Sequence, residues 1–153
     1  MKLRVISISK DDNEKTGELF SDYVNRLKHY IPFETLNIKP QKASSPAEQQ
    51  RSDASLLLKK LLPDEYVVLL DERGKQLNSV QLSDFITKNL NSSKRSLVFV
   101  VGGAYGFDQT VYERSNELLS LSKMTLPHQL AKVLLAEQLY RAFTILRNEK
   151  YHH

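Results

Sequence analysis

Residues 97–103 read LVFVVGG, a run of five apolar residues followed directly by two glycines. A short run that is apolar at every position predicts a strand covered on both faces, which is typical of parallel sheets flanked by helices. Residues 66–70, YVVLL, repeat this pattern. The two runs make an α/β fold the first expectation for this chain.

Alternating strand and helix patterns surround these two runs. Strands are expected where residues alternate in polarity or are continuously apolar, at 2–8, 33–38, 66–70, 97–101 and 117–122. Amphipathic helices are expected where apolar residues recur at helical spacing, at 14–29, 80–90 and from Pro127 to about Leu146. The order β-α-β-α-β-α-β-(α)-β-α predicts an α/β sandwich with a largely parallel sheet.

Two polar stretches are expected to be irregular. Residues 40–53 contain two prolines and several Ser, Gln and Lys residues, and they predict a loop that runs into a helix ending near Leu62 and Pro63. Residues 71–74, DERG, follow the apolar run at 66–70 and predict a turn that closes that strand.

Composition excludes several classes of protein. A chain of 153 residues that is 41% hydrophobic and 26% charged is expected to form one soluble domain over residues 1–153. No apolar run approaches the ~20 residues of a membrane helix, and the start, MKLRVISISKDDNE, does not resemble a signal peptide, so a cytoplasmic location is expected. The absence of cysteine excludes disulfides, a thiol nucleophile and thiolate metal sites.

The charge balance is compatible with RNA. The net charge is +4 and the isoelectric point is near 9.2, which suits a polyanionic partner. Many small cytosolic enzymes are equally basic, so charge alone does not distinguish an RNA-binding protein from such an enzyme.

The last predicted helix is apolar around most of its circumference. Its polar residues Glu137, Arg141 and Thr144 fall within about 60° of one another, whereas a surface helix needs only one apolar stripe. Such a helix is expected to be buried on two sides, and a second copy of the chain is the simplest partner, so a homodimer is predicted. Burial inside a single domain is the alternative.

Two loops follow buried strands, at the edge where open α/β sheets bind ligands. Residues 102–106, GGAYG, match neither the dinucleotide fingerprint nor the P-loop, so they form either a structural turn or a close approach to a ligand. Asp71 either caps its turn or helps to shape a pocket. Residues 120–128, SLSKMTLPH, place His128 in the first turn of the last helix, as a structural hydrogen-bonding group or as a catalyst.

Polar residues near the C-terminus also have two interpretations. Glu137 and Arg141 are four residues apart and are expected to pair, unless Arg141 faces a phosphate or a partner subunit. The terminal Tyr151-His152-His153 is a frayed end or the remnant of a tag when judged from the residues alone. No metal site is expected, because no carboxylate cluster accompanies these histidines.

Several motifs together resemble a known family. They are LDERGK at 70–75, VVGGAYG at 100–106, SLSKMTLPH at 120–128, AEQLYRA at 136–142 and YH at 151–152. In this order and spacing they resemble the family of ribosomal RNA large subunit methyltransferase H, over essentially the whole chain. The chain departs from the family pattern at SISK, residues 7–10, where a glycine is frequent, and at His153, where some members carry a basic residue.

The resemblance implies a fold and a reaction. The fold is the SPOUT α/β sandwich with a C-terminal trefoil knot, in a homodimer. The reaction is transfer of a methyl group from S-adenosylmethionine to N3 of a pseudouridine in 23S rRNA, and the small net charge favours the assembled ribosome as substrate. The alternatives are a SPOUT methyltransferase acting on another RNA position, such as a ribose 2′-hydroxyl, and a non-catalytic RNA- or ribosome-binding dimer.

The resemblance also assigns residues. Cofactor contacts carried over by motif are Leu70, Gly102, Leu121, Ser122, Lys123, Met124, Thr125 and Leu126. Catalytic positions carried over in the same way are His128, Arg141, Tyr151 and His152, and the tail that holds the last two is expected to reach the substrate across the dimer. The group that removes the N3 proton stays open between Tyr151, His152 and solvent.

Overall fold

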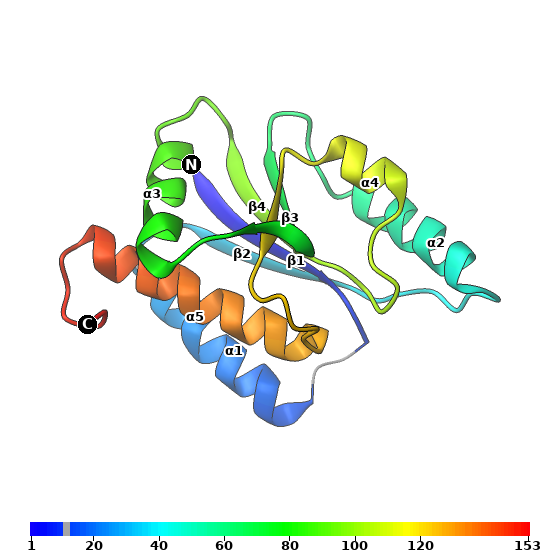
Figure 1. Ribbon diagram of the computed structural model, residues 1–153, viewed down its shortest axis with the longest axis horizontal. Helices are drawn as coiled ribbons and strands as arrows, with labels where there is room; N and C mark the ends of the chain where they lie inside the picture. The colour runs from blue at the N-terminus through cyan, green and yellow to red at the C-terminus, as the bar shows by residue number, and fades with distance from the viewer. Residues whose placement is uncertain (11–12) are drawn as a thin grey trace.

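Five parallel strands form one sheet within residues 1–10 and 13–153, the part of the chain that the computed structural model describes (Figure 1). The strands are β1 (Lys2–Ile8), β2 (Phe33–Ile38), β3 (Tyr66–Gln76), β4 (Ser96–Val101) and β5 (Glu117–Ser120). The helices are α1 (Glu14–Leu27), α2 (Pro46–Leu58), α3 (Ser79–Leu90), α4 (Gln109–Arg114) and α5 (His128–Leu146). Residues 11 and 12 belong to the stretch MKLRVISISKDDNE, which does not resemble a signal peptide, and they lie outside the described residues.

The strand order is β2-β1-β4-β3-β5, and every pairing is parallel. The predicted element order and parallel sheet are confirmed, including the short helix before the last strand. Helices α1, α3 and α5 cover one face of the sheet and α2 and α4 cover the other (Figure 1). This arrangement explains the LVFVV run, because successive side chains of a strand enter opposite cores and both cores here are covered.

The central strand β4 shows this two-sided burial directly. All of its residues are buried. Leu97 and Phe99 belong to the core beneath α1, α3 and α5, while Val98 and Val100 belong to the core beneath α2 and α4. The sheet therefore divides the interior into two hydrophobic layers, and the carboxyl ends of its strands meet along one edge.

The turn predicted at 71–74 is wrong, because β3 continues to Gln76. Leu70 and Lys75 are both in register with Leu119 of β5, so the four residues between them bulge out of the ladder. Gly74 makes this possible, since a Cβ there would lie 2.6 Å from the Leu118 carbonyl carbon. The bulge turns Asp71 and Arg73 toward the carboxyl edge of the sheet, where both line a cavity.

The loop predicted at 40–53 is shorter than expected, because α2 begins at Pro46. Proline fits the first turn of a helix, and the Ser45 hydroxyl accepts a hydrogen bond from the Glu48 N–H at 3.2 Å. Polar residues in this turn face solvent, which is why composition alone suggested a loop. The other boundaries shift modestly: helices expected to end at 29 and near 62 end at Leu27 and Leu58, and β5 ends at Ser120 instead of 122.

The apolar circumference of α5 is covered largely within the chain. The helix lies between α1 and α3 and packs on β4 (Figure 1). Lys132 is buried with its ammonium 4.6 Å from the centre of the Phe20 ring, and buried Thr144 donates its hydroxyl to the Arg141 carbonyl at 2.7 Å. Burial inside a single domain, the alternative given for this helix, therefore accounts for most of its apolar surface, because three elements of one chain surround it. The homodimer stays a prediction. Leu130 and Leu134 are the large apolar side chains of its first half that stay exposed.

A buried ion pair fixes the opposite end of the sheet. Arg4 Nη1 lies 2.6 Å from Glu65 Oε1, which also accepts from the Ser96 hydroxyl at 2.8 Å, and the Leu62 N–H donates to Glu65 Oε2 at 2.9 Å. Burial alone raises the pKa of Glu65, but the Leu62, Ser96 and Arg4 hydrogen bonds outweigh it and lower that pKa. This network ties the amino ends of three strands together, away from the cavity. None of the described helices is long and apolar enough to cross a membrane.

Candidate functional site

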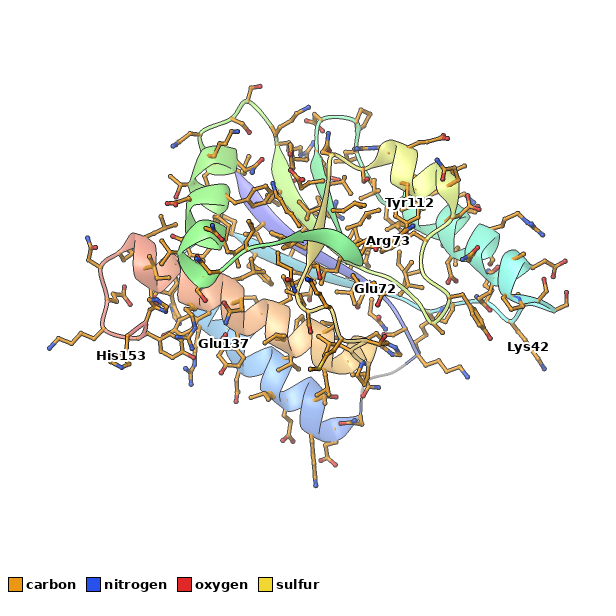
Figure 2. The ribbon with its side chains drawn as sticks, in the orientation of Figure 1. Lys42, Glu72, Arg73, Tyr112, Glu137 and His153 are labelled. Carbon is orange, nitrogen blue, oxygen red and sulfur yellow. The ribbon has the colours of Figure 1, made fainter. Side chains whose placement is uncertain are left out.

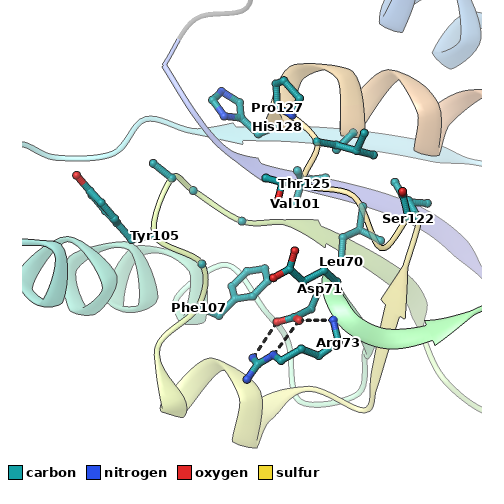
Figure 3. A pocket seen from close by; sticks show the side chains of 18 of the residues that line it. Leu70, Asp71, Arg73, Val101, Tyr105, Phe107, Ser122, Thr125, Pro127 and His128 are labelled. Carbon is teal, nitrogen blue, oxygen red and sulfur yellow. Dashed lines mark hydrogen bonds and ion pairs between the residues drawn. The ribbon is translucent and has the colours of Figure 1, made fainter.

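A cavity of about 580 Å³ opens at the carboxyl ends of β3 and β4, the edge where parallel sheets commonly bind ligands (Figure 3). Its volume lies in the range of small-molecule and cofactor sites. Three segments line it: residues 70–73 from the β3 bulge, residues 101–107 at and after the end of β4, and all of 121–128 except Lys123 after β5. Tyr112 of α4 and Ala131 of α5 complete the lining. The motifs singled out at 70–75, 100–106 and 120–128 therefore surround one space.

The segment after β4 brings main chain close to the cavity. A Cβ on Gly102 would lie 2.9 Å from the Phe107 ring, so only glycine fits here without displacing that ring. Phe107 is itself buried and packs edge-on against Tyr112 at 5.9 Å between ring centres. The GGAYG segment is therefore not only a structural turn, because its backbone forms a wall of the cavity.

The segment after β5 is held by its serines. The Ser120 hydroxyl donates to the Ser122 carbonyl at 2.9 Å, and the Ser122 hydroxyl accepts from the Met124 N–H at 2.9 Å. These bonds keep the main chain open along the cavity instead of continuing β5. Of the predicted cofactor residues, those lining the cavity are Leu70, Gly102, Leu121, Ser122, Met124, Thr125 and Leu126. Lys123 does not line it and is exposed to solvent.

An acidic and aromatic cluster forms the wall on the β3 side (Figure 3). Asp71 Oδ1 accepts from Arg73 Nε at 3.1 Å and Asp71 Oδ2 from Arg73 Nη2 at 3.0 Å, while the Tyr112 hydroxyl donates to Asp71. The Arg73 guanidinium lies 5.0 Å from the centre of the Tyr112 ring. Asp71 therefore helps to shape a pocket. Tyr112 was missed by sequence reasoning, because nothing in the short α4 sequence signals proximity to β3.

The cluster keeps Asp71 ionised. The Arg73 hydrogen bonds, together with that from Tyr112, outweigh burial and lower the pKa of Asp71 to about 2. Burial, and then the hydrogen bond to Asp71, raise the pKa of Tyr112 to about 12. At neutral pH the wall therefore holds a carboxylate, a guanidinium and a neutral phenol in fixed positions.

The four predicted catalytic residues fall into two groups. His128 opens α5 and lines the cavity. Arg141 lies farther along the same helix, about 20 Å from His128 along the axis. Tyr151 and His152 lie beside Arg141 and do not line the cavity, so one chain does not bring the four together.

The second group forms a compact tail cluster, defined here as Glu137, Tyr140, Arg141, Tyr151 and His152. Glu137 Oε1 lies 2.6 Å from Arg141 Nη2 and accepts from the Tyr151 hydroxyl at 3.1 Å. The Arg141 guanidinium lies 4.8 Å from the Tyr151 ring centre, and its Nη1 is 3.4 Å from His152 Nδ1. The predicted Glu137–Arg141 pair is confirmed. Tyr151 and His152 pack on α5 rather than fray, whereas His153 is exposed.

Figure 2 shows that the cavity wall and the tail cluster lie apart, with Arg73 and Tyr112 of the wall on one side of the molecule and Glu137 of the tail cluster on the other. Among the described residues no group of three or more His, Asp or Glu side chains is arranged to hold a metal ion. The cavity offers main chain, apolar walls, the carboxylates of Asp71 and Glu72 and the guanidinium of Arg73. Apolar walls with a few polar groups suit an organic cofactor that carries an apolar ring system and charged groups.

A protein family described as "Predicted SPOUT methyltransferase" matches residues 1–152. The chain belongs to the SPOUT methyltransferase family. This confirms the family resemblance inferred from the motifs, and the all-parallel α/β sheet agrees with it. Because the match extends over both the cavity and the tail cluster, the family assignment covers both groups of candidate residues.

Named relatives of this SPOUT methyltransferase are similar over their full length. A protein from Parabacteroides distasonis named Ribosomal RNA large subunit methyltransferase H is 47% identical, over 100% of this chain and 99% of the relative. Proteins of the same name from Flavobacterium psychrophilum and Pelobacter propionicus are 44% and 42% identical, over 100% of this chain and 99% and 100% of theirs.

A solved structure supports the fold alone. A probable methylase family protein from Haemophilus influenzae Rd KW20 superposes with a TM-score of 0.53 and 13% sequence identity. The match covers 97% of this chain and 67% of that one. At this identity it speaks for a shared architecture of sheet and helices.

Proposed function

We propose that this SPOUT methyltransferase transfers a methyl group from S-adenosylmethionine to N3 of a pseudouridine in the 23S rRNA of the large ribosomal subunit. One observation carries the proposal. The three segments 70–75, 100–106 and 120–128, far apart in sequence, meet around a single cavity at the carboxyl edge of the sheet. The names of full-length relatives at 42–47% identity support the substrate.

The residues of the cavity fit this cofactor. Leu70, Leu121 and Leu126 offer apolar contacts for an adenine ring. The missing side chain of Gly102 makes room for the Phe107 ring, which lines the same cavity. The Asp71 carboxylate is paired with Arg73 on one wall, so the unpaired negative charge there comes from the neighbouring Glu72, which is favourable for a ligand with a sulfonium and an ammonium group. When bound, S-adenosylmethionine supplies the activated methyl group.

The protein's own part in such a reaction is positioning and proton transfer. A methyl transfer proceeds in line, so holding the base at the open mouth of the cavity removes much of the barrier. The N3 atom must also lose its proton. Burial, and then hydrogen bonds to Tyr23 and Glu137, raise the pKa of Tyr151, so its phenol stays protonated and acts as a donor. We therefore assign proton removal to His152 or to solvent.

We further propose that a homodimer completes the site. The tail cluster lies about 20 Å from His128 along α5, so a tail from a second copy is needed to bring Tyr151 and His152 to the cavity. Leu130, Leu134, Glu137 and Arg141 follow one another at i, i+4, i+7 and i+11 and share one face of α5. The two leucines on this face stay exposed, at 52% and 38%. An apolar stripe that leads into the tail cluster suits contact with a second copy.

The remaining expectations stay predictions. They are a single domain over residues 1–153, a trefoil knot in its C-terminal part, and a cytoplasmic location beside the ribosome. The net charge of +4 is small for a protein that grips naked RNA, which favours the assembled ribosome or large subunit as substrate.

The test is methyl transfer from labelled S-adenosylmethionine to large subunits and ribosomes with or without pseudouridine in their rRNA. The proposal expects label that requires pseudouridine and that mass mapping places on base N3. Label on a ribose 2′-hydroxyl would contradict the base assignment. Absence of cofactor binding by calorimetry would instead support a non-catalytic RNA-binding dimer.

A further inference from the structure

An aromatic side chain stands exposed at the rim of the cavity. Tyr105 lies in the turn between Gly103 and Gly106, which the Gly106 N–H closes by donating to the Gly103 carbonyl at 3.2 Å. Its side chain lines the cavity mouth and is 53% exposed. Large aromatic side chains usually bury most of their surface, so an exposed one beside a cavity needs an explanation.

The ring does not face the interior of the cavity. Figure 3 shows Tyr105 pointing outward from the glycine turn, away from Leu70 and Asp71 on the inner wall. The orientation argues against a contact with a cofactor bound between these walls. It leaves the face of the ring available to a ligand that arrives from outside.

Helix α2 holds this turn in place. The Gln50 side-chain N–H donates to the Tyr105 carbonyl at 2.6 Å. Asp53, which is buried, lies beneath the turn, with Oδ2 2.8 Å from the position of a Cβ on Gly103. Asp53 is oriented in turn by Gln49, whose side-chain N–H donates to Oδ1 at 2.9 Å. The backbone that carries Tyr105 is thus fixed before any ligand binds, which lowers the entropic cost of using the ring.

The surroundings of the mouth suit a nucleic acid. Met124, which is 78% exposed, forms another part of the rim. Lys123, the preceding residue, is exposed beside it and lies outside the lining. A lysine ammonium attracts phosphate, and aromatic and apolar side chains contact the faces of bases. A base that is to react in the cavity must also leave its stack, which exposes the face of its neighbour.

We propose that Tyr105 is the platform on which a base of the substrate RNA stacks while the target base occupies the cavity. The inference rests on the proposed function for the identity of the RNA, and it adds a positioning residue outside the cofactor-binding and tail segments. The phenol hydroxyl has no part in stacking, so phenylalanine at this position keeps the function.

The experiment compares Tyr105→Ala and Tyr105→Phe with wild type, using pseudouridine-containing large subunits and labelled S-adenosylmethionine. Loss of one base–aromatic stack corresponds to a rise of about tenfold in KM for the large subunit. We expect this rise for Tyr105→Ala, with kcat and the cofactor Kd within about twofold of wild type. Tyr105→Phe is expected to match wild type, as is Leu19→Ala, which trims a similarly exposed apolar side chain on α1.

Three results would overturn the inference. They are an unchanged KM in Tyr105→Ala, a weakened cofactor Kd in that variant, and an equal loss in Tyr105→Phe, which would point to the hydroxyl. A wild-type protein that transfers no methyl group would contradict the proposed function instead. In that case the affinity of Tyr105→Ala for large subunits, measured by filter binding, decides the inference: about tenfold weaker binding supports the platform and unchanged binding rejects it.

Discussion

The two ends of α5 differ in almost every respect that matters for binding. At its start, Pro127 provides no side-chain cap and His128 borders an open cavity whose walls are partly main chain. At its far end, the tail folds back and packs Tyr151 against Tyr140, with ring centres 4.7 Å apart. The start of α5 therefore borders an open cavity, whereas the surface at its far end is covered by the chain's own side chains.

This difference separates two tasks that the sequence motifs place together. Residues 120–128 and 136–142 are close in sequence, yet the helix between them spaces their functional ends by about 20 Å. Variants at the cavity end are therefore expected to change cofactor affinity, and variants at the tail end to change methyl transfer.

Glu65→Ala removes the centre of the buried network at the opposite edge of the sheet and touches neither end of α5. Breaking a buried ion pair costs about 3–5 kcal/mol, and here it also leaves the Ser96 hydroxyl and the Leu62 N–H without their carboxylate. We expect the free energy of unfolding in urea to fall by about this amount. Cofactor affinity at a temperature where the variant is folded should stay within twofold. A large affinity loss in folded protein would contradict the separation.

Gly102→Val tests the cavity end. The added side chain meets the Phe107 ring, because even a Cβ would lie 2.9 Å away. Overpacking costs about 1–3 kcal/mol of folding stability. Because the displaced Phe107 ring also lines the cavity, we expect the affinity for S-adenosylmethionine to fall by up to about a hundredfold. Calorimetry measures this loss, and circular dichroism checks that the fold is retained. Affinity within a few-fold of wild type would show that the cofactor does not approach this wall.

Tyr151→Phe tests the tail end. It removes the hydroxyl that donates to Glu137 at 3.1 Å and leaves the ring beside the Arg141 guanidinium and edge-on to Tyr140. Loss of one such bond loosens the tail by about 1.5 kcal/mol, the lower end for a bond to a charged group, so we expect kcat to fall about tenfold. Cofactor affinity should be unchanged. A parallel loss of cofactor affinity would place the tail at the cofactor itself.

Acid stability tests the Asp71 cluster at the cavity. The pKa of Asp71 is lowered to about 2 in the folded protein, so its ionised form stabilises the fold at neutral pH. That contribution disappears as the pH falls from about 4 toward 2. We expect the melting temperature of wild type to approach that of Asp71→Asn over this interval, as followed by circular dichroism. A difference that widens on acidification would contradict the sign of the shift.

The sequence predicted the layers of this fold well and its local exceptions poorly. The LVFVV and YVVLL runs identify buried strands because burial on both faces leaves a direct mark on composition. The bulge in β3 left no such mark, since DERG has the composition of a turn and only the register with Leu119 shows that the strand continues. The start of α2 was hidden in the same way, because its first turn is polar and exposed.

In the candidate site, too, the sequence predicted features within one segment and missed contacts between segments. Motif residues within one segment, such as 121–126, were predicted together and lie together, with Lys123 the exception. Tyr112 was missed because its contact with Asp71 joins α4 to β3 across a gap of 41 residues. Periodicity describes one element at a time and carries no information about such contacts.

If a homodimer completes the site, the cavity of one copy works with the tail of the other. Gly102→Val and His152→Ala are first each assayed as homodimers, at a cofactor concentration at which methyl transfer by both is lost. Chains of the two kinds are then co-produced with different affinity tags, and the mixed dimers are isolated and assayed for methyl transfer to large subunits. We expect about half of wild-type activity, because one site per mixed dimer combines an intact cavity with an intact tail. Wild-type chains paired with the double variant should be inactive. If the mixed dimers of the single variants are inactive and this control has half activity, each cavity works with the tail of its own chain, which contradicts the shared site.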